Sequence, residues 1–167
     1  MEIRDKDRII GFLDGSLPDY KGRHHKDILA FSDEELESCH DQIQWMFPLH
    51  EGSKFAETCP ILTKEVVGLF GSAVLENIML AVNRMVDFYG LGEEPVTDKH
   101  KEWCVNGNHN LLRITRMIRC LRLVGLDEEA LSLYLLVMEV GVKTGIDPVT
   151  MMYWSKALFD DEWETLR

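Results

Sequence analysis

Four arginines lie in one segment, residues 108–124, that contains no acidic residue. They are Arg113, Arg116, Arg119 and Arg122, and their spacing of three makes them spiral around a helix. The residues that share one helix face are instead His109, Arg113, Arg116 and Cys120. Two guanidinium groups one turn apart repel each other unless an anion lies near them. That anion is either an acidic side chain from another helix or a carboxylate or phosphate of a ligand, because both fit the guanidinium fork.

A second cluster combines an aromatic ring with carboxylates. If residues 33–47 form one helix, Glu34, Asp41 and Trp45 lie on the arc opposite its apolar residues. Tryptophan is enriched at the energetic centres of binding sites. The alternative is that Trp45 packs under a neighbouring loop while its indole N–H finds an acceptor inside the protein.

The two clusters carry opposite charges. Guanidinium groups on a covered helix face are costly unless they are paired. We therefore expect Asp19 or Asp41 to approach Arg113 or Arg116 and to close a partly buried charge network.

The sequence carries no recognisable metal, cofactor or catalytic motif. Its four cysteines are scattered and lack the spacing of zinc ligands: Cys39, Cys59, Cys104 and Cys120. It has no glycine-rich phosphate loop, no G-x-S-x-G and no H-E-x-x-H. We therefore expect neither a metal nor a cofactor, and we favour a protein that is not an enzyme.

The charge balance and the apolar runs restrict partners and location. The chain has 29 acidic and 18 basic residues, a net charge of −11, which repels nucleic-acid backbones. Residues 1–8 alternate in charge and lack the apolar core of a secretory signal. The longest apolar run, residues 133–138, is far shorter than the roughly 18 residues of a membrane span. We expect a cytoplasmic protein without a nucleic-acid partner or integral membrane association; the sequence leaves its oligomeric state open.

Helix signals dominate the chain, and no segment alternates apolar and polar residues for long enough to indicate a strand. Ser32 and Glu35 form a capping box, while Thr63, Ser72 and Asp127 are further N-cap candidates. Residues 91–107 are the most linker-like stretch. Residues 128–143 are apolar on nearly every side, which predicts a central helix. We therefore predict one all-α domain, residues 1–167, with about six to eight helices around that central helix and a frayed acidic tail at 159–167.

Several long blocks of this sequence resemble the conserved N-terminal region of the opioid growth factor receptor family. They are residues 17–23 (LPDYKGR), 27–37 (DILAFSDEELE), 40–49 (HDQIQWMFPL), 108–116 (NHNLLRITR) and 121–126 (LRLVGL). Mild departures occur at Phe31, Gln42 and Met46, where the family has Trp, Tyr and Leu. Animal members of the family are described as receptors for the opioid peptide Met-enkephalin. The resemblance implies a binding module, in a form that we expect to stand alone.

Three hypotheses follow for the function. The first is a binding module for a peptide or a small zwitterionic or anionic molecule. Its predicted site residues are Asp19, Tyr20, Arg23, Asp41, Gln44, Trp45, His109, Asn110, Arg113 and Arg116. The second is an enzyme in which His109 is the general acid and base and the arginines hold an anionic substrate. The third is that these residues only lock the helices together.

Overall fold

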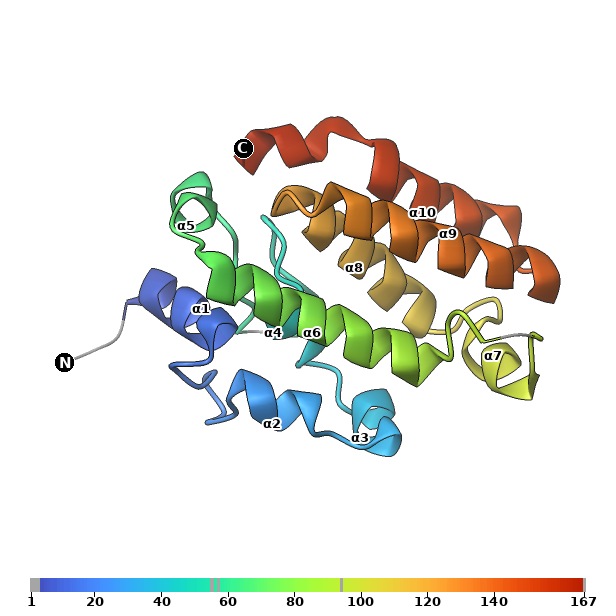
Figure 1. Cartoon of the computed structure of the whole chain (residues 1–167), viewed down its shortest axis with the longest axis horizontal. Coiled ribbons are helices and arrows are strands. Elements are labelled where there is room, and N and C mark those ends of the chain that lie inside the picture. The colour runs from blue at the N-terminus through green and yellow to red at the C-terminus, as the bar shows by residue number, and fades with distance from the viewer. Residues whose placement is uncertain (1–3, 55, 57, 94, 167) are drawn as a thin grey trace. The chain divides into compact units, whose positions relative to one another are not determined.

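The fold is built from helices alone. The computed structural model describes residues 4–54, 56, 58–93 and 95–166, and this part of the chain contains ten α-helices, one 3-10 helix and no β-strand (Figure 1). Two isolated bridges, Leu49 with Ile61 and Ser53 with Ala56, are its β-type pairings. The predicted all-α class is therefore confirmed. The chain divides into two compact units, Met1–Arg84 with Leu166–Arg167 (unit 1) and Met85–Thr165 (unit 2).

Unit 1 consists mainly of short helices. They are α1 (Asp5–Asp14), α2 (His25–Leu29), α3 (Asp33–Ser38), α4 (Ile43–Met46), α5 (Lys64–Gly68) and the larger part of α6 (Ser72–Tyr89). Helices α3 and α5 begin at side-chain caps, Ser32 and Thr63. The capping box before α3 is present: Ser32 Oγ accepts from the Glu35 N–H at 3.1 Å, and the Glu35 carboxylate accepts from the Ser32 N–H at 2.7 Å. Helix α1 ends at Gly15, whose φ of 89° is a left-handed conformation that favours glycine.

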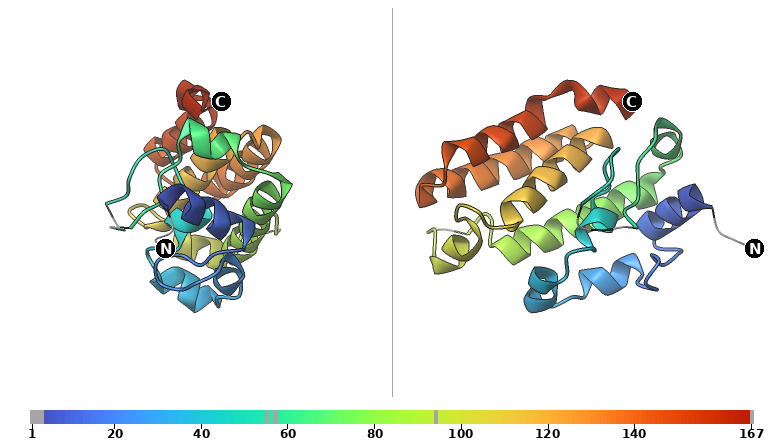
Figure 2. Two further views of the ribbon diagram at one scale, coloured as in Figure 1. Left: turned by 90° about the vertical axis from the view of Figure 1, so that its left-hand side faces the viewer. Right: turned by 180° about the vertical axis from the view of Figure 1, so that it is seen from behind.

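Unit 2 is organised around three helices that lie side by side (Figures 1 and 2). Its elements are the end of α6, then α7 (Asp98–Trp103), α8 (Asn110–Leu123), α9 (Asp127–Thr144), α10 (Pro148–Phe159) and the 3-10 helix η1 (Asp161–Leu166) up to residue 165. Trp154 of α10 is fully buried and donates its indole N–H to the Leu111 carbonyl at 3.2 Å. Gly141 lets α9 approach this ring, because a Cβ there would lie 3.2 Å from Trp154 and from Ile146.

The single helix predicted over residues 33–47 is wrong, because the chain breaks between α3 and α4. Cys39 has an extended backbone, and the buried Gln42 side chain donates to the Leu36 carbonyl at 3.2 Å. A continued helix would have bonded that carbonyl to the backbone N–H of His40. The break also removes the predicted polar arc, so Trp45 lies in the core with the rest of α4 rather than on a solvated face.

The segment predicted to be most linker-like contains the helix α7. Its N-cap residue Thr97 donates a backbone N–H to His100 Nδ1 at 2.9 Å. His100 Nε2 then donates to the Gly90 carbonyl at 2.7 Å, and the Trp103 indole N–H donates to the Tyr89 carbonyl at 3.0 Å. The helix is therefore held within unit 2 by buried hydrogen bonds. A histidine in the third position of a capping box is not part of the usual Ser/Thr-x-x-Glu pattern.

Two further expectations differ from the structure. Helix α9 buries one stripe of residues, whereas Leu131, Leu135 and Val142 are exposed, so it is not surrounded on all sides. The tail predicted to be frayed forms η1, in which Glu162 accepts two hydrogen bonds from Arg119 at 2.6 and 2.9 Å. Of the helices in the described part of the chain, none is both long enough and apolar enough to cross a membrane.

Candidate functional site

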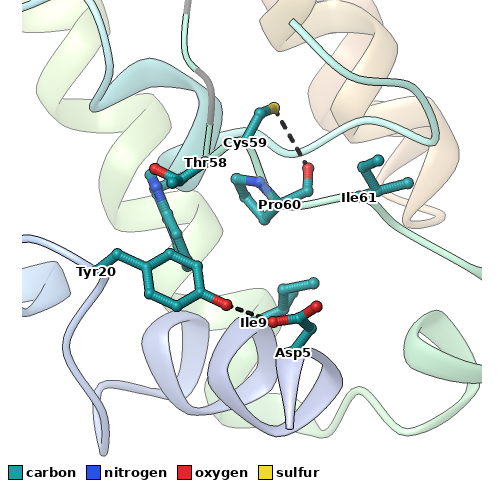
Figure 3. Close-up of a pocket in the computed structure, with 8 residues that line it drawn as sticks. Asp5, Ile9, Tyr20, Thr58, Cys59, Pro60 and Ile61 are labelled. Atoms are coloured by element: carbon teal, nitrogen blue, oxygen red, sulfur yellow. Dashed lines mark hydrogen bonds between the residues drawn. The ribbon is translucent and has the colours of Figure 1, made fainter. Parts of the chain in front are cut away.

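Unit 1 contains a pocket of about 340 Å³ with aromatic, apolar and acidic walls (Figure 3). It is lined by Asp5, Ile9, Tyr20, Trp45, Thr58, Cys59, Pro60 and Ile61. Small-molecule sites in proteins range from roughly 300 to 1,000 Å³. This pocket is therefore large enough for a small ligand or for one end of a peptide.

Four segments build the walls. Helix α1 contributes Asp5 and Ile9, which are four residues apart and therefore share one helix face. The loop before α2 contributes Tyr20, and α4 contributes Trp45. The far wall is the loop of residues 58–61, where the Cys59 thiol donates to the Pro60 carbonyl at 3.5 Å (Figure 3).

Tyr20 is held in place from both ends. Its hydroxyl donates to the Asp5 carboxylate, and this hydrogen bond, with burial, raises the pKa of Tyr20 above its usual value (Figure 3). The guanidinium of Arg8 lies 4.7 Å from the centre of the Tyr20 ring. Arg8 also donates to the Pro18 carbonyl at 3.0 Å, which ties the loop to α1. The phenol therefore has a defined position although about half of the residue is exposed.

Trp45 forms the base of the aromatic wall. It is only 3% exposed, and its ring meets Tyr20 edge-on, with centroids 5.6 Å apart and planes at 72°. On another side it meets Phe12, with centroids 5.2 Å apart. Such edge-to-face pairs add about 0.5–1.5 kcal/mol beyond the burial of the rings. Trp45 thus packs under the loop that carries Tyr20, which is the alternative that the sequence left open for this residue.

A charge network fixes the loop that carries Tyr20. Asp19, 2% exposed, accepts the Arg23 Nε–H at 2.7 Å and also the backbone N–H groups of Lys21 and Arg23, each at 2.9 Å. Arg23 Nη1 donates to Asp41 at 2.9 Å, and Lys21 forms a second ion pair with Asp41. Burial alone would raise the pKa of Asp41, but hydrogen bonds from Lys21, Arg23 and Cys39 hold it well below its usual range.

These contacts change the interpretation of the two acids. Asp19 and Asp41 were expected to approach Arg113 or Arg116, and the structure gives both of them a different partner, Arg23. Gln44, the remaining predicted site residue of unit 1, is buried and donates to Ser53 at 3.2 Å. Of the six predicted site residues in unit 1, Tyr20 and Trp45 line the pocket directly. Asp19, Arg23 and Asp41 hold the loop beside it.

The predicted site residues of unit 2 lie on or next to the first turns of α8. Asn110 and Arg113 are buried, and the Asn110 side-chain oxygen accepts from the Tyr89 hydroxyl at 3.0 Å and from Arg113 at 3.3 Å. His109 is the residue before α8, and Arg116 is partly buried one turn after Arg113. That these four residues share one ligand site with the residues of unit 1 stays a prediction.

The other arginines of α8 have structural partners. Arg119 pairs with Glu162, while Arg122 pairs with Asp127 at 2.6 Å and lies 4.6 Å from the ring centre of Trp163. Burial raises the pKa of the Cys120 thiol to about 12, although Arg116 acts in the opposite direction. A thiol held protonated in this way is a packing group and not a nucleophile.

Most of the pocket wall consists of residues that were not predicted from the sequence. Asp5 and Ile9 have the four-residue spacing of a helix face, but Asp5 stands in an N-terminal run of alternating charges that gave it no special role. Residues 58–61 belong to a loop with no motif. Among the residues that the structure describes, no cluster of three or more His, Cys, Asp or Glu could hold a metal ion.

Comparison with known proteins identifies relatives of this chain. The profile of the family described as "Opioid growth factor receptor (OGFr) conserved region" matches residues 22–159. The human opioid growth factor receptor is 32% identical over 103 residues, a match that covers 55% of this chain and 15% of the human protein. No solved structure matches the chain.

Proposed function

This chain belongs to the opioid growth factor receptor conserved-region family, and we propose from that premise that it is a binding module whose ligand enters the pocket of unit 1. The observation that carries the proposal is the pocket itself, with Tyr20 and Trp45 on one wall and the Asp5 carboxylate beside them. Aromatic side chains with few, well-placed polar groups are the usual lining of ligand sites.

The ligand that best suits this site is a peptide or a small zwitterion. The apolar side chains of Ile9 and Ile61, with Pro60, offer contact for a hydrocarbon group, and Asp5 offers one charged partner. The human relative is named as a receptor, which also favours a ligand-binding role for the shared region. That protein is much longer than the matched region, so its whole activity is not transferred to this chain.

The site is also preformed. Tyr20 is fixed by Asp5 and Arg8, and its loop is fixed by the network of Asp19, Arg23 and Asp41. A binding site that does not have to be ordered by its ligand avoids about 0.5–1.5 kcal/mol for each immobilised side chain. The charge network therefore supports binding by fixing the loop that carries Tyr20. Its own carboxylates and guanidinium pair with one another.

A pair of surface variants tests the proposal. Ile61 lines the pocket and is exposed, so Ile61→Arg should block the pocket without removing a core residue. Leu69, which follows α5 and is also exposed, does not line the pocket, so Leu69→Arg is the matched control. Both variants and the parent would be screened against the same peptide array, and hits measured by calorimetry.

We expect peptides that bind the parent and the Leu69→Arg variant to lose at least tenfold in affinity for Ile61→Arg. Ligands that bind all three proteins equally would show that the pocket is not the binding site. The melting temperature of each variant is compared with that of the parent. Equal melting temperatures show that a loss of affinity does not come from unfolding.

A further inference from the structure

We infer that the pocket of unit 1 selects a ligand with an ammonium group on an apolar body, and disfavours an anionic head group. This inference rests on the proposed function and specifies the ligand class of the same pocket. It follows from the charges of the lining residues that the structure describes, among which Asp5 is the one carboxylate and no lysine or arginine occurs.

Asp5 differs from its acidic neighbours in its partners. Asp7, in the same helix turn, pairs with Arg4 at 2.8 Å, and Glu65 pairs with Lys6 at 2.6 Å. Among the described residues, Asp5 is hydrogen-bonded to the neutral hydroxyl of Tyr20 and forms no ion pair. The two cations next to it in sequence are therefore engaged elsewhere, and its charge remains available to a ligand.

The groups around Asp5 suit an ammonium head. The Tyr20 hydroxyl uses its proton for Asp5, and the Arg8 side chain also acts on its oxygen, so the Asp5 carboxylate and not the phenol is the acceptor for a ligand N–H. The guanidinium of Arg8 lies over the Tyr20 ring but is not part of the pocket lining, and it donates to the Pro18 carbonyl. Ile9, Pro60 and Ile61 then provide apolar surface for the carbon chain of the amine.

Three probes with one hydrocarbon body and different head groups test the inference directly. They are 3-methylbutylamine, 3-methylbutan-1-ol and 4-methylpentanoate, which carry the same 3-methylbutyl group and are cationic, neutral and anionic at pH 7. Each would be titrated into isotopically labelled protein, and the affinity taken from the shifts of backbone and side-chain resonances of the lining residues. Because Asp5 is exposed, we expect the amine to bind about two- to fivefold more tightly than the alcohol, the range of a solvent-exposed ion pair. The carboxylate should bind most weakly.

The charge of Asp5 can be removed while its hydrogen bond is kept. In Asp5→Asn the side-chain oxygen still accepts from the Tyr20 hydroxyl, so the pocket should keep its shape and lose its preference for the amine. Asp14→Asn is the matched control, since Asp14 lies at the other end of α1, outside the pocket lining, and its side chain accepts the Ser16 N–H at 2.8 Å. This control should retain the full preference.

The outcomes separate the inference from the proposed function. Equal binding of amine and alcohol at the lining residues, or tighter binding of the carboxylate, would overturn the inference while the pocket remained a ligand site. A preference for the amine that survives in Asp5→Asn would also overturn it. If none of the three probes shifts the lining resonances, both the inference and the assignment of the pocket as the binding site are refuted.

Discussion

The buried imidazole of His25 should make the stability of this protein depend on pH between 4 and 7. His25 is 2% exposed, its ring lies 5.7 Å from that of Phe12, and its Nε2 atom is buried with no hydrogen-bond partner among the described residues. Burial therefore lowers the pKa of His25 from 6.5 to about 4. The imidazole of the unfolded chain binds a proton more readily than that of the folded chain.

The sign and size of the effect follow from this difference. Above pH 6.5 both states are neutral at this residue and stability is highest. As the pH falls from 6.5 towards 4, the unfolded state takes up the proton first, so the free energy of unfolding decreases. With one pKa unit equivalent to about 1.4 kcal/mol, the total loss is about 3 kcal/mol, of which about 2 kcal/mol is lost between pH 7 and pH 5.

Urea unfolding at pH 5 and pH 7, followed by circular dichroism, measures this loss. The same experiment on His25→Gln isolates the residue, because glutamine does not titrate: the variant should lose about 2 kcal/mol less than the parent over this interval. The comparison stays above the pH range in which carboxylates such as Asp41 take up protons. If the parent and the variant show the same pH dependence, His25 is not a neutral buried imidazole and the explanation is wrong.

Three further predictions concern the elements that position the pocket and the core. Arg23→Met should destabilise the protein by about 3 kcal/mol, because it leaves the buried Asp19 carboxylate and Asp41 without their guanidinium; a melting temperature equal to the parent's would show that the network is not needed. Gly141→Val should cost about 1–3 kcal/mol by forcing atoms against Trp154, which thermal unfolding can check, and an unchanged or raised stability would contradict the close packing of α9 and α10. Ser32→Ala should cost about 1 kcal/mol through loss of the cap of α3, measurable by urea unfolding, and no loss would mean that the capping box contributes nothing to stability.

The sequence predicted the helical class because capping residues act locally. Ser32 and Thr63 each accept a backbone N–H at the start of a helix, as their types and spacing indicated, whereas Asp127 is the first residue of α9 and Leu126 is its N-cap. The break after α3 was not predicted, since it depends on Gln42 and on a buried environment that the local sequence does not reveal. Helix α7 was missed for a similar reason: His100 Nδ1 accepts the Thr97 N–H at the start of the helix while Nε2 donates to the distant Gly90 carbonyl, a contact that the local sequence does not reveal.

The candidate site was predicted in part. Tyr20 and Trp45, two of the predicted ligand-site residues, line the pocket, and its other walls come from Asp5 of α1 and a loop near residue 60 that were not predicted. Contacts between such distant segments have no spacing that could be recognised in one sequence. Asp19 and Arg23, four residues apart, were both predicted as ligand-site residues, and their pairing with each other was not predicted.

The most direct test of the binding-module proposal is the response of the Trp45 indole N–H to a ligand in a ¹H–¹⁵N correlation spectrum. The chain has four tryptophans, and Trp45→Phe identifies the signal of Trp45 by its disappearance. The proposal predicts that a peptide that binds the protein, added to saturation, shifts the Trp45 signal. The signal of Trp154, which is fully buried in unit 2 and bonded to the Leu111 carbonyl, should stay in place. A bound peptide that leaves Trp45 unchanged would contradict the assignment of this pocket as the binding site.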